Sequence, residues 1–419
     1  MKLLLIGSGG REHALAWKIL QSPLCDHLTI INGNAGMEEI ADCLPISQDD
    51  HDKILEVINE RLIDFVIIGP EAPLVAGLSD KIRACGVPVF GPSKAASILE
   101  GSKGFMKDLC AKYNIPTAAY VRFDDYDAAK NYIEKMGAPI VIKQDGLAAG
   151  KGVVVAMSMD EALTALHDMF FGINKNQSVV IEEFMDGEEV SYFALTDGKR
   201  LIPLTSAQDH KRVFDGDKGP NTGGMGAYSP APIFTKEIEA YSIKTIIQPT
   251  IDAMRAEGLE FSGVLFAGLM IINGVPKLLE YNVRFGDPEC QAIMRRMDSD
   301  LVELLYAIAT KAENIPLPRF NPAPSLCVVM AAEGYPAEYK KNTVIQNLDQ
   351  AAFDSSITIF HAGTKREEGK ILSIGWRVLG VTCLDPSLKT AQEKSYKAID
   401  LIDWPTGFCR RDIGYRALK

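Results

Sequence analysis

The chain has 419 residues, of which 47% are hydrophobic and 24% are charged, so we expect a globular protein of about two to four domains with a large core. Its net charge of −11 argues against a nucleic-acid-binding surface, and it has no apolar run of about 18 residues for a membrane span. Its eight cysteines are scattered without metal-binding spacing, and the first apolar run is too short for a signal peptide. We therefore expect a cytoplasmic protein.

The first hundred residues alternate between short apolar runs and helical patterns, which predicts a doubly wound parallel sheet. The expected strands are Leu3–Ile6, Leu28–Ile31, Phe65–Ile68 and Val87–Phe90, and the expected helices are Glu12–Leu20, Asp52–Arg61 and Ala76–Cys85. The first loop resembles a dinucleotide fingerprint but fails it, because Glu12 stands in place of the third glycine. This loop is either a tight strand-to-helix turn or a site for part of a phosphorylated sugar at a helix N-terminus.

A glycine-rich stretch near residue 145 is the strongest local signal. Two apolar runs, Ile140–Ile142 and Val153–Val155, predict a strand–loop–strand unit, and glycines and lysines lie between and beside them: Lys143, Gly146, Gly150, Lys151 and Gly152. Glycine backbone N–H groups and lysine ammonium groups suit a hairpin that covers phosphates. A P-loop is excluded by the glycine spacing and by the strand that follows, which leaves a plain glycine-rich hairpin as the alternative.

The sequence on either side of this hairpin predicts a small α+β lobe over residues 118–195. Helical patterns cover Ser102–Asn114 and Asp127–Met136, and a capping box at Ser158 opens a helix to about Phe170. A strand over Val179–Phe184 is expected to turn at Asp186-Gly187 and return as Glu189–Leu195. The polar, glycine-rich segment Ser206–Pro230 is expected to be a long functional loop, and a helix from about Lys236 to Glu257 is interrupted at Pro249.

A second hairpin carries candidate metal ligands. Asn273-Gly274 between Gly263–Ile272 and Pro276–Arg284 is a strong turn signal. Residues two apart on a strand share a face, so Glu280, Asn282 and Arg284 point together. Two oxygen ligands beside an arginine suit Mg²⁺ that bridges phosphates, and a solvated strand face is the alternative.

The last hundred residues predict a third, smaller domain. Its expected strands are Leu326–Ala331, Thr358–His361 and Arg377–Thr382, followed by a helix over Leu388–Leu401. The predicted domains are therefore residues 1–101, 102–324 and 325–419.

The motifs together resemble the glycinamide ribonucleotide synthetase family of ATP-grasp enzymes. The matching stretches occur in order over nearly the whole chain: GGREHALAWK, GNAGM, GPEAPLVAGL, LEGSKGFMKD, APIVIKQDGLAAGKGV, VIEEFMDGEE, QDHKR, GPNTGGMGAYSPAP, EYNVRFGDPE, VVMAAEGYP, FHAGTK and FCRRDIG. The resemblance implies an α/β fold with a doubly wound N-terminal domain, an ATP-grasp lid, a central α+β domain and a small C-terminal α/β domain. It also implies ATP-dependent ligation of glycine to 5-phosphoribosylamine in purine synthesis. The acidic composition and the self-contained predicted domains favour a monomer.

The resemblance also implies roles for individual residues. It assigns ATP to Lys103, Lys143, Asp145, Gly146, Gly150, Lys151, Gly152, Glu182, Glu183, Phe184, Met185, and Glu188 or Glu189. It assigns glycine and the transferred phosphoryl group to Lys143, Asp209, Lys211, Asn221, Gly223, Gly224, Met225, Arg284 and Asp287. It assigns the sugar substrate to Gly9, Gly10, Arg11, Asn34, Gly36, Gly69, Pro70 and Glu71. It assigns Mg²⁺ or Mn²⁺ to Glu280 and Asn282.

Two features depart from the family pattern. Ile374 and Trp376 replace two residues of an Asn-Gly-Gly-Arg turn, and the strand Phe266–Met270 lacks the additional acid that many ATP-grasp enzymes place there. The alternatives are another ATP-grasp ligase or carboxylase of purine synthesis and a catalytically silent nucleotide-binding protein. We expect Lys143, at a strand end, to contribute little to the core.

Overall fold

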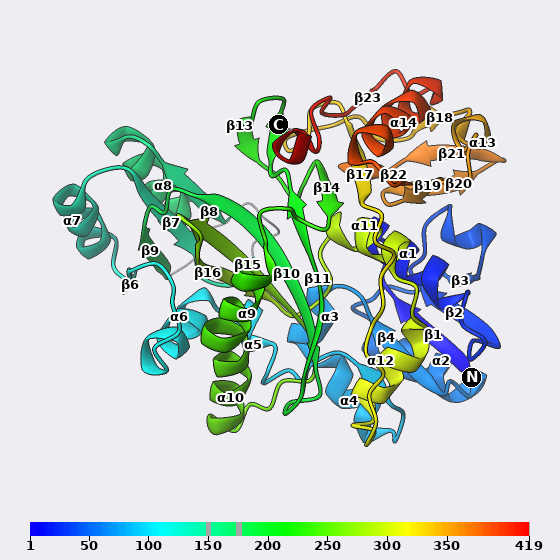
Figure 1. Cartoon of the computed structure of the whole chain (residues 1–419), viewed down its shortest axis with the longest axis horizontal. Helices are drawn as coiled ribbons and strands as arrows, with labels where there is room; N and C mark the ends of the chain where they lie inside the picture. Colours follow the sequence, from blue (N-terminus) through cyan, green and yellow to red (C-terminus); the bar gives the residue numbers. More distant parts are fainter. Residues whose placement is uncertain (148–151, 173–177, 419) are drawn as a thin grey trace.

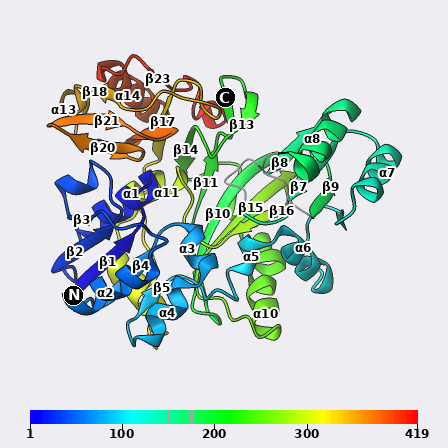
Figure 2. The ribbon, with the colours of Figure 1, turned by 180° about the vertical axis from the view of Figure 1, so that it is seen from behind.

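The computed structural model describes residues 1–147, 152–172 and 178–418. Figure 1 shows a central sheet with the lobe of α7 and α8 at one end of the molecule, and the N-terminal and C-terminal parts side by side at the other. Figure 2 shows the same arrangement from behind.

The N-terminal part is a five-stranded parallel sheet in the order β3-β2-β1-β4-β5, as the alternating pattern predicts. Its elements are β1 (Lys2–Ile6), α1 (Gly10–Ile19), β2 (His27–Ile31), η1 (Met37–Glu39), β3 (Asp42–Leu44), α2 (His51–Arg61), β4 (Phe65–Ile68), α3 (Glu71–Ala76), α4 (Leu78–Ala84) and β5 (Val89–Phe90). The sequence analysis missed β3, a three-residue edge strand without a buried face, and α3, whose first turn contains Pro73. Proline is tolerated in a first turn because the N–H there has no helical acceptor.

The lobe is a four-stranded sheet, β6-β9-β7-β8, that packs against α7 and α8. Its elements and the two preceding helices are α5 (Ile98–Gly101), α6 (Lys103–Lys112), β6 (Tyr120–Phe123), α7 (Tyr126–Met136), β7 (Ile140–Gln144), β8 (Val153–Ala156), α8 (Met159–Phe171) and β9 (Val179–Glu183). β7 and β8 pair antiparallel with Lys143 opposite Val153, which confirms the two strands of the predicted hairpin. The predicted site residues Gly150 and Lys151 lie outside the described residues. Ser158 caps α8 by accepting from the Glu161 N–H, as predicted.

The predicted hairpin between Val179–Phe184 and Glu189–Leu195 is wrong, because its two strands belong to different sheets. β9 pairs with β6 and β7, whereas β10 (Glu188–Thr196) pairs with β11 (Leu201–Asp209) and β15 (Gly263–Ile272). Gly187 meets a packing need instead, since a Cβ there would lie 2.5 Å from the Ile271 carbonyl oxygen.

The central sheet has nine strands in the order β16-β15-β10-β11-β14-β17-β22-β19, with β23 paired to β17. The other elements of this central part of the chain are β12 (Arg212–Phe214), β13 (Lys218–Asn221), β14 (Gly226–Ser229), α9 (Lys236–Ser242), η2 (Ile243–Ile247), α10 (Gln248–Ala256), β16 (Val275–Asn282), α11 (Glu289–Arg296) and α12 (Leu301–Ala309). β12 and β13 pair with each other as a separate two-stranded sheet. The prediction of one long loop over Ser206–Pro230 is wrong, because this segment contains the end of β11 and three short strands. The interrupted helix is confirmed as α9, a π-helical turn and α10, with Pro249 in the first turn of α10.

The second predicted hairpin is confirmed. β15 and β16 pair antiparallel, and the turn residues Asn273 and Gly274 have φ of 50° and 80°. Positive φ at both positions is typical of the two-residue turn that matches strand twist. A register shift between Gly268 and Leu269 leaves Leu279 as the extra residue of β16, immediately before Glu280.

The C-terminal part continues the central sheet. Its elements are β17 (Ser325–Ala332), β18 (Thr343–Ile345), α13 (Leu348–Ala351), β19 (Ile357–His361), β20 (Thr364–Glu367), β21 (Lys370–Ser373), β22 (Arg377–Leu384), α14 (Leu388–Leu401), β23 (Gly407–Phe408) and η3 (Tyr415–Leu418). The predicted strands and the predicted helix over Leu388–Leu401 are confirmed. β17 pairs with β14, so β17, β22, β19 and β23 extend the central sheet, whereas β18, β21 and β20 form a separate three-stranded sheet.

Shared cores join the N-terminal part to the central sheet. Leu3 and Leu5 on one face of β1 cluster with α11 and α12, whereas Leu4 and Ile6 on the other face cluster with α10 and β15. Burial of both faces fixes the carboxyl ends of β1 and β4 beside the carboxyl end of β16.

Candidate active site

A cavity of about 780 Å³ opens between the four parts of the molecule and is lined by all of them. The predicted site residues in its wall are Gly9, Arg11, Asn34, Glu71, Lys103, Lys143, Gly146, Gly152, Glu182, Glu183, Phe184, Met185, Glu189, Asp209, Lys211, Asn221, Gly223, Glu280, Asn282, Arg284 and Asp287. Among the described residues, eight predicted positions lie outside this wall: Gly10, Gly36, Gly69, Pro70, Asp145, Glu188, Gly224 and Met225.

Glu12 organises the loop that failed the dinucleotide fingerprint. Its buried carboxylate accepts from the Gly9 N–H at 2.8 Å and from Arg11 Nε at 2.5 Å. A Cβ on Gly69 would lie 2.2 Å from Glu12 Oε1, so Gly69 is needed for packing against this carboxylate. The fingerprint glycine is therefore replaced by an acid that closes the loop and holds Arg11 toward the cavity.

The other glycine-rich loops also serve packing. Gly36 lies against two histidine rings, where a Cβ would approach His13 to 2.4 Å and His361 to 2.7 Å. The Asn34 amide donates to the carbonyls of Ser8 and His361, and its oxygen accepts from two backbone N–H groups. The side chain of Asn34 is thus hydrogen-bonded within the protein, and its role at the cavity is to shape the loop that lines it.

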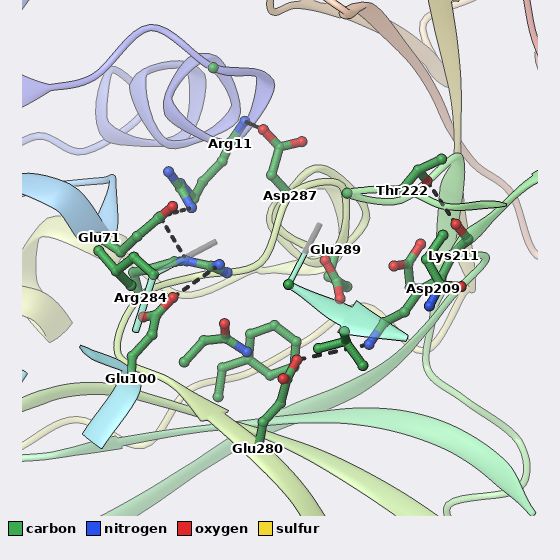
Figure 3. A pocket seen from close by; sticks show the side chains of 18 of the residues that line it. Arg11, Glu71, Glu100, Asp209, Lys211, Thr222, Glu280, Arg284, Asp287 and Glu289 are labelled. Carbon is green, nitrogen blue, oxygen red and sulfur yellow. Dashed lines mark hydrogen bonds and ion pairs between the residues drawn. The ribbon is translucent and has the colours of Figure 1, made fainter. Parts of the chain in front are cut away.

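Arg284 lies between two carboxylates at the N-terminal side of the cavity (Figure 3). Its Nε is 3.1 Å from Glu71 Oε2 and its Nη2 is 3.3 Å from Glu100 Oε1. Burial opposes ionisation of Glu71, but the charges of Arg284 and Arg11 bring its pKa down to about 2. Burial raises the pKa of Glu100. Glu100, from the short helix α5, was not predicted as a site residue, although it lies in the matching stretch LEGSKGFMKD.

Three lysines surround the β16 carboxylate of Glu280. Lys211 Nζ is 4.0 Å from Glu280 Oε1, and Lys103 Nζ donates to the Gly146 carbonyl at 2.9 Å. Burial opposes ionisation of Glu280, but the charges of Lys211, Lys143 and Lys103 lower its pKa. Glu280 therefore stays an anion in a pocket whose other charges favour phosphate.

Asp145 fastens the glycine hairpin to α6. Its carboxylate accepts from the Ser102 hydroxyl at 3.2 Å, the Gly104 N–H at 3.2 Å and the Gly146 N–H at 3.0 Å. The side chain thereby positions the backbone of the hairpin.

Lys143 is buried, contrary to the expectation from its place at a strand end. It is 4% exposed, its Nζ lies 2.9 Å from Glu182 Oε1, and it donates to the Leu279 carbonyl at 3.2 Å. Glu182 lines the cavity together with Phe184 and Met185 but is only 2% exposed, because its carboxylate lies against buried lysines. Of the two candidate glutamates beyond, Glu189 lines the cavity and pairs with Lys211, and Glu188 lies near Gln208.

Asp209 and Glu289 form a buried acidic pair in the cavity. Figure 3 shows Glu289 between Arg284 and Asp209, with Asp209 beside Lys211 and Thr222. Burial and the charge of Glu289 raise the pKa of Asp209, and burial raises the pKa of Glu289. Glu289 accepts from the Ser191 hydroxyl at 2.9 Å. The sequence analysis missed Glu289 as a site residue, although it predicted the turn into its helix.

The C-terminal part supplies a wall that the sequence analysis also missed. Arg377 Nη1 donates to the carbonyls of Gly223 and Asp287, each at 2.5 Å, and the Tyr335 hydroxyl accepts from the Gly223 N–H at 2.9 Å. The departing residues Ile374 and Trp376 line the cavity here. The Trp376 indole donates to the Ala337 carbonyl at 3.2 Å, so the departure places an anchored aromatic ring at the rim.

The described residues contain no group of three His, Cys, Asp or Glu side chains placed to share a metal ion. Glu280 and Asn282 remain as two oxygen donors from one strand face, beside a space lined by cations. In the described part of the chain, no helix is both long and apolar enough to cross a membrane.

Comparison with known proteins gives one consistent family. The models of the phosphoribosylglycinamide synthetase N, ATP-grasp (A) and C domains match residues 1–100, 101–290 and 325–416. A relative from Brucella melitensis named phosphoribosylamine–glycine ligase is 54% identical over 422 residues, which covers 100% of this chain and 99% of that protein. The chloroplastic relative from Arabidopsis thaliana is 51% identical over 98% of this chain and 79% of that protein.

Solved structures agree with these relatives. The crystal structure of phosphoribosylamine–glycine ligase from Thermotoga maritima is 32% identical, has a TM-score of 0.87, and aligns over 99% of this chain and 100% of that chain. Biotin carboxylase from Campylobacter jejuni, at 14% identity and a TM-score of 0.71 over 97% of this chain and 92% of that chain, shares the fold. The chain therefore belongs to the phosphoribosylglycinamide synthetase family of ATP-grasp ligases.

Proposed function

We propose that this protein joins glycine to 5-phosphoribosylamine with ATP, and that it gives glycinamide ribonucleotide, ADP and phosphate, the second step of purine nucleotide synthesis. One observation carries the proposal. A single cavity has a lysine-lined region beside Glu280 and Asn282, an acidic pair at Asp209 and Glu289, and an arginine-containing edge at the N-terminal loops. These three environments suit a nucleotide polyphosphate, an amino acid and a sugar phosphate.

The chemistry requires activation of a carboxylate, which is a poor electrophile. Transfer of the γ-phosphoryl group of ATP to the glycine carboxylate gives glycyl phosphate, and attack by the sugar amine then releases phosphate. Lys103, Lys143 and Lys211 would offset the phosphate charges, because fixed cations in a site shielded from water stabilise charge that develops during transfer. The residues Phe184 and Met185 would contact the adenine.

Glu280 and Asn282 fit a divalent cation, Mg²⁺ or Mn²⁺, held jointly with ATP phosphates. Magnesium in phosphoryl-transfer sites is commonly bound by one or two protein oxygens, with phosphates and water completing its shell. Such an ion would supply charge neutralisation to the transferring phosphoryl group. The surrounding lysines place positive charge beside Glu280, which supports phosphate oxygens next to a cation held by Glu280 and Asn282.

The acidic pair suits the ammonium group of glycine. Asp209 and Glu289 share a buried region of the cavity, and an ammonium group would stabilise both as carboxylates. We propose this acidic pair for glycine in place of Asp209 with Arg284, which lie apart in Figure 3. We assign the edge with Arg284, Arg11 and the N-terminal loops to the sugar substrate.

An ADP-release assay tests the proposal. The protein is given ATP and Mg²⁺ with glycine, with phosphoribosylamine, or with both, and the product is identified by mass spectrometry. We expect sustained ADP formation only with both substrates. ADP formation that is supported by bicarbonate and is independent of glycine would instead favour a carboxylase, and no ADP under any condition would favour a silent nucleotide-binding protein.

We further propose that the protein acts as a monomer in the cytoplasm, because one chain supplies every side of the cavity. Light scattering during size-exclusion chromatography tests the monomer, and a mass of twice 45.8 kDa would contradict it.

A further inference from the structure

A second lysine lies behind the one that faces the cavity. Lys107, on α6, is 0% exposed and does not belong to the cavity wall. Its Nζ lies 3.0 Å from Glu182 Oε2 and donates to the Thr117 hydroxyl at 2.7 Å. The other Glu182 oxygen lies 2.9 Å from Lys143 Nζ. Two ammonium groups therefore share one carboxylate.

Within the buried cluster of Lys107, Glu182 and Lys143, this sharing leaves a net charge of +1, and the charge of Lys143 also acts on Glu280. Burial lowers the pKa of Lys107, the charge of Glu182 opposes that effect, and the charge of Lys143 adds to it. A direct ion pair at 3.0 Å favours the ammonium form. Because charges interact strongly where water is excluded, the excess charge favours an anion in the adjoining cavity.

The same cluster is tied to the strand that carries Glu280. Lys143 donates to the carbonyl of Leu279, the extra residue of the β16 bulge. The Thr117 hydroxyl, which accepts from Lys107, donates to the Leu278 carbonyl at 2.7 Å. Lys107 thus contributes to the placement of both the lobe lysine and the β16 segment at one side of the cavity.

We infer that Lys107 is a positioning residue of the nucleotide site: by taking one oxygen of Glu182, it leaves the charge of Lys143 available to nucleotide phosphates. Without Lys107, the carboxylate of Glu182 would offset Lys143 fully. The inference rests only on the nucleotide-binding part of the proposed function, so it can be tested without glycine or the sugar substrate.

The test measures binding of ADP, AMP and adenosine by calorimetry to the full chain and to Lys107→Met. We expect the variant to bind ADP at least tenfold more weakly, AMP less weakened, and adenosine unchanged, since the effect follows ligand charge. Lys112→Met is the matched control, because Lys112 lies on the same helix with a 62% exposed side chain that pairs with Glu257. It is expected to bind all three ligands like the unmodified chain.

A charge-restoring variant separates positioning from scaffolding. Lys107→Met with Glu182→Gln leaves Lys143 with the original net charge of the cluster, so we expect ADP affinity to recover to within about threefold of the unmodified chain. Equal loss for adenosine and ADP, or no recovery in the double variant, would overturn the inference. If Lys107→Met does not fold, the single variant Glu182→Gln decides: its affinity for ADP should rise relative to its affinity for adenosine, and an unchanged or lower ratio of the two affinities would overturn the inference.

Discussion

At the scale of single residues, burial determines which charged side chains of this cavity contribute to stability as well as to function. Lys143 and Glu182 are both almost inaccessible, although each belongs to a strand that borders the cavity. A buried ion pair is costly to break, since the remaining partner keeps its charge without water. Loss of activity in such a variant must therefore be separated from loss of stability.

Replacement of Lys143 by alanine is expected to reduce glycine-dependent ADP formation by on the order of 100-fold or more, because a phosphate-facing cation is lost. It should also lower the free energy of unfolding by about 2 kcal/mol, since Glu182 keeps only Lys107 as its partner. Activity assays and urea denaturation measure the two effects. Lys277→Ala, which removes an exposed pair with Glu183, is the control and should change stability by less than about 1 kcal/mol. Full stability of Lys143→Ala would contradict the structural part.

Gly224→Ala should raise the KM for glycine and lower stability. Gly224 has φ of +110°, and a Cβ there would lie 2.6 Å from Pro288 Cδ and 2.8 Å from Asp209 Oδ1. The carboxylate must move for the methyl group to fit. Gly274→Ala carries a similar φ of +80° with open space around it, so it controls for backbone strain alone. Equal KM values in the two variants, measured by initial rates, would remove Asp209 from the glycine site.

Residue types and spacing predicted that Glu280 and Asn282 share a face of β16, and the family resemblance supplied most of the other predicted residues found in the cavity wall. They did not predict Glu100, Glu289 or Lys107, whose roles depend on partners far away in the sequence. Asn34 is a further example: the sequence predicts it as a substrate-binding residue, but its side-chain amide donates a hydrogen bond to the carbonyl of the distant His361.

At the scale of elements, the β15–β16 hairpin is the best example of local prediction. Asn273-Gly274 sets the turn, alternation sets the face, and the bulge at Leu279 adjusts the strand just before Glu280. The failed predictions share a cause. Val179–Phe184 and Glu189–Leu195 have strand patterns, but the choice of partner strand is a tertiary property that alternation does not encode. Similarly, the glycine-rich composition of Ser206–Pro230 indicates a loop, because its three strands are too short to show the alternation of polar and apolar residues that is typical of a strand.

Glu280→Gln and Asn282→Ala test the β16 face. Both should lose ADP formation, Glu280→Gln by on the order of 100-fold or more, because a charged metal ligand is lost. Excess Mn²⁺ should partly restore Asn282→Ala, where the carboxylate remains. The metal concentration for half-maximal activity is the measurement. An activation curve in Glu280→Gln that matches the unmodified chain would exclude a metal role for this carboxylate.

At the scale of the whole molecule, two buried histidines join the first and last parts of the chain. His13 Nδ1 accepts from the His361 N–H at 2.8 Å, and the ring centroids are 5.7 Å apart. Burial and the charge of His361 lower the pKa of His13 to about 3, and burial and the charge of Arg366 lower the pKa of His361 to about 4. The contact therefore requires neutral rings.

Acid should weaken this contact. The folded pKa values lie below the ordinary value of about 6.5, so the unfolded chain takes up protons first as the pH falls, and stability decreases from pH 6.5 toward pH 4. His13→Asn keeps an acceptor oxygen without a titrating ring. Between pH 7 and pH 5, this variant should therefore lose about 2 kcal/mol less stability than the unmodified chain. Urea denaturation at both pH values measures this, with the exposed His27→Asn as control. An unchanged pH dependence in His13→Asn would contradict the assignment.

The pairing of β14 with β17 makes the final hundred residues indispensable to the sheet that precedes them. A chain cut after Pro324 would leave the N–H and C=O groups of Gly226–Ser229 without their partners, next to a newly exposed apolar face. Such an open edge is a template for other strands, so the shortened protein would precipitate rather than yield a smaller working enzyme. A partner protein should accordingly be inserted within the β20–β21 turn, at Glu368-Gly369, because the chain on both sides is kept and β22 stays between β17 and β19.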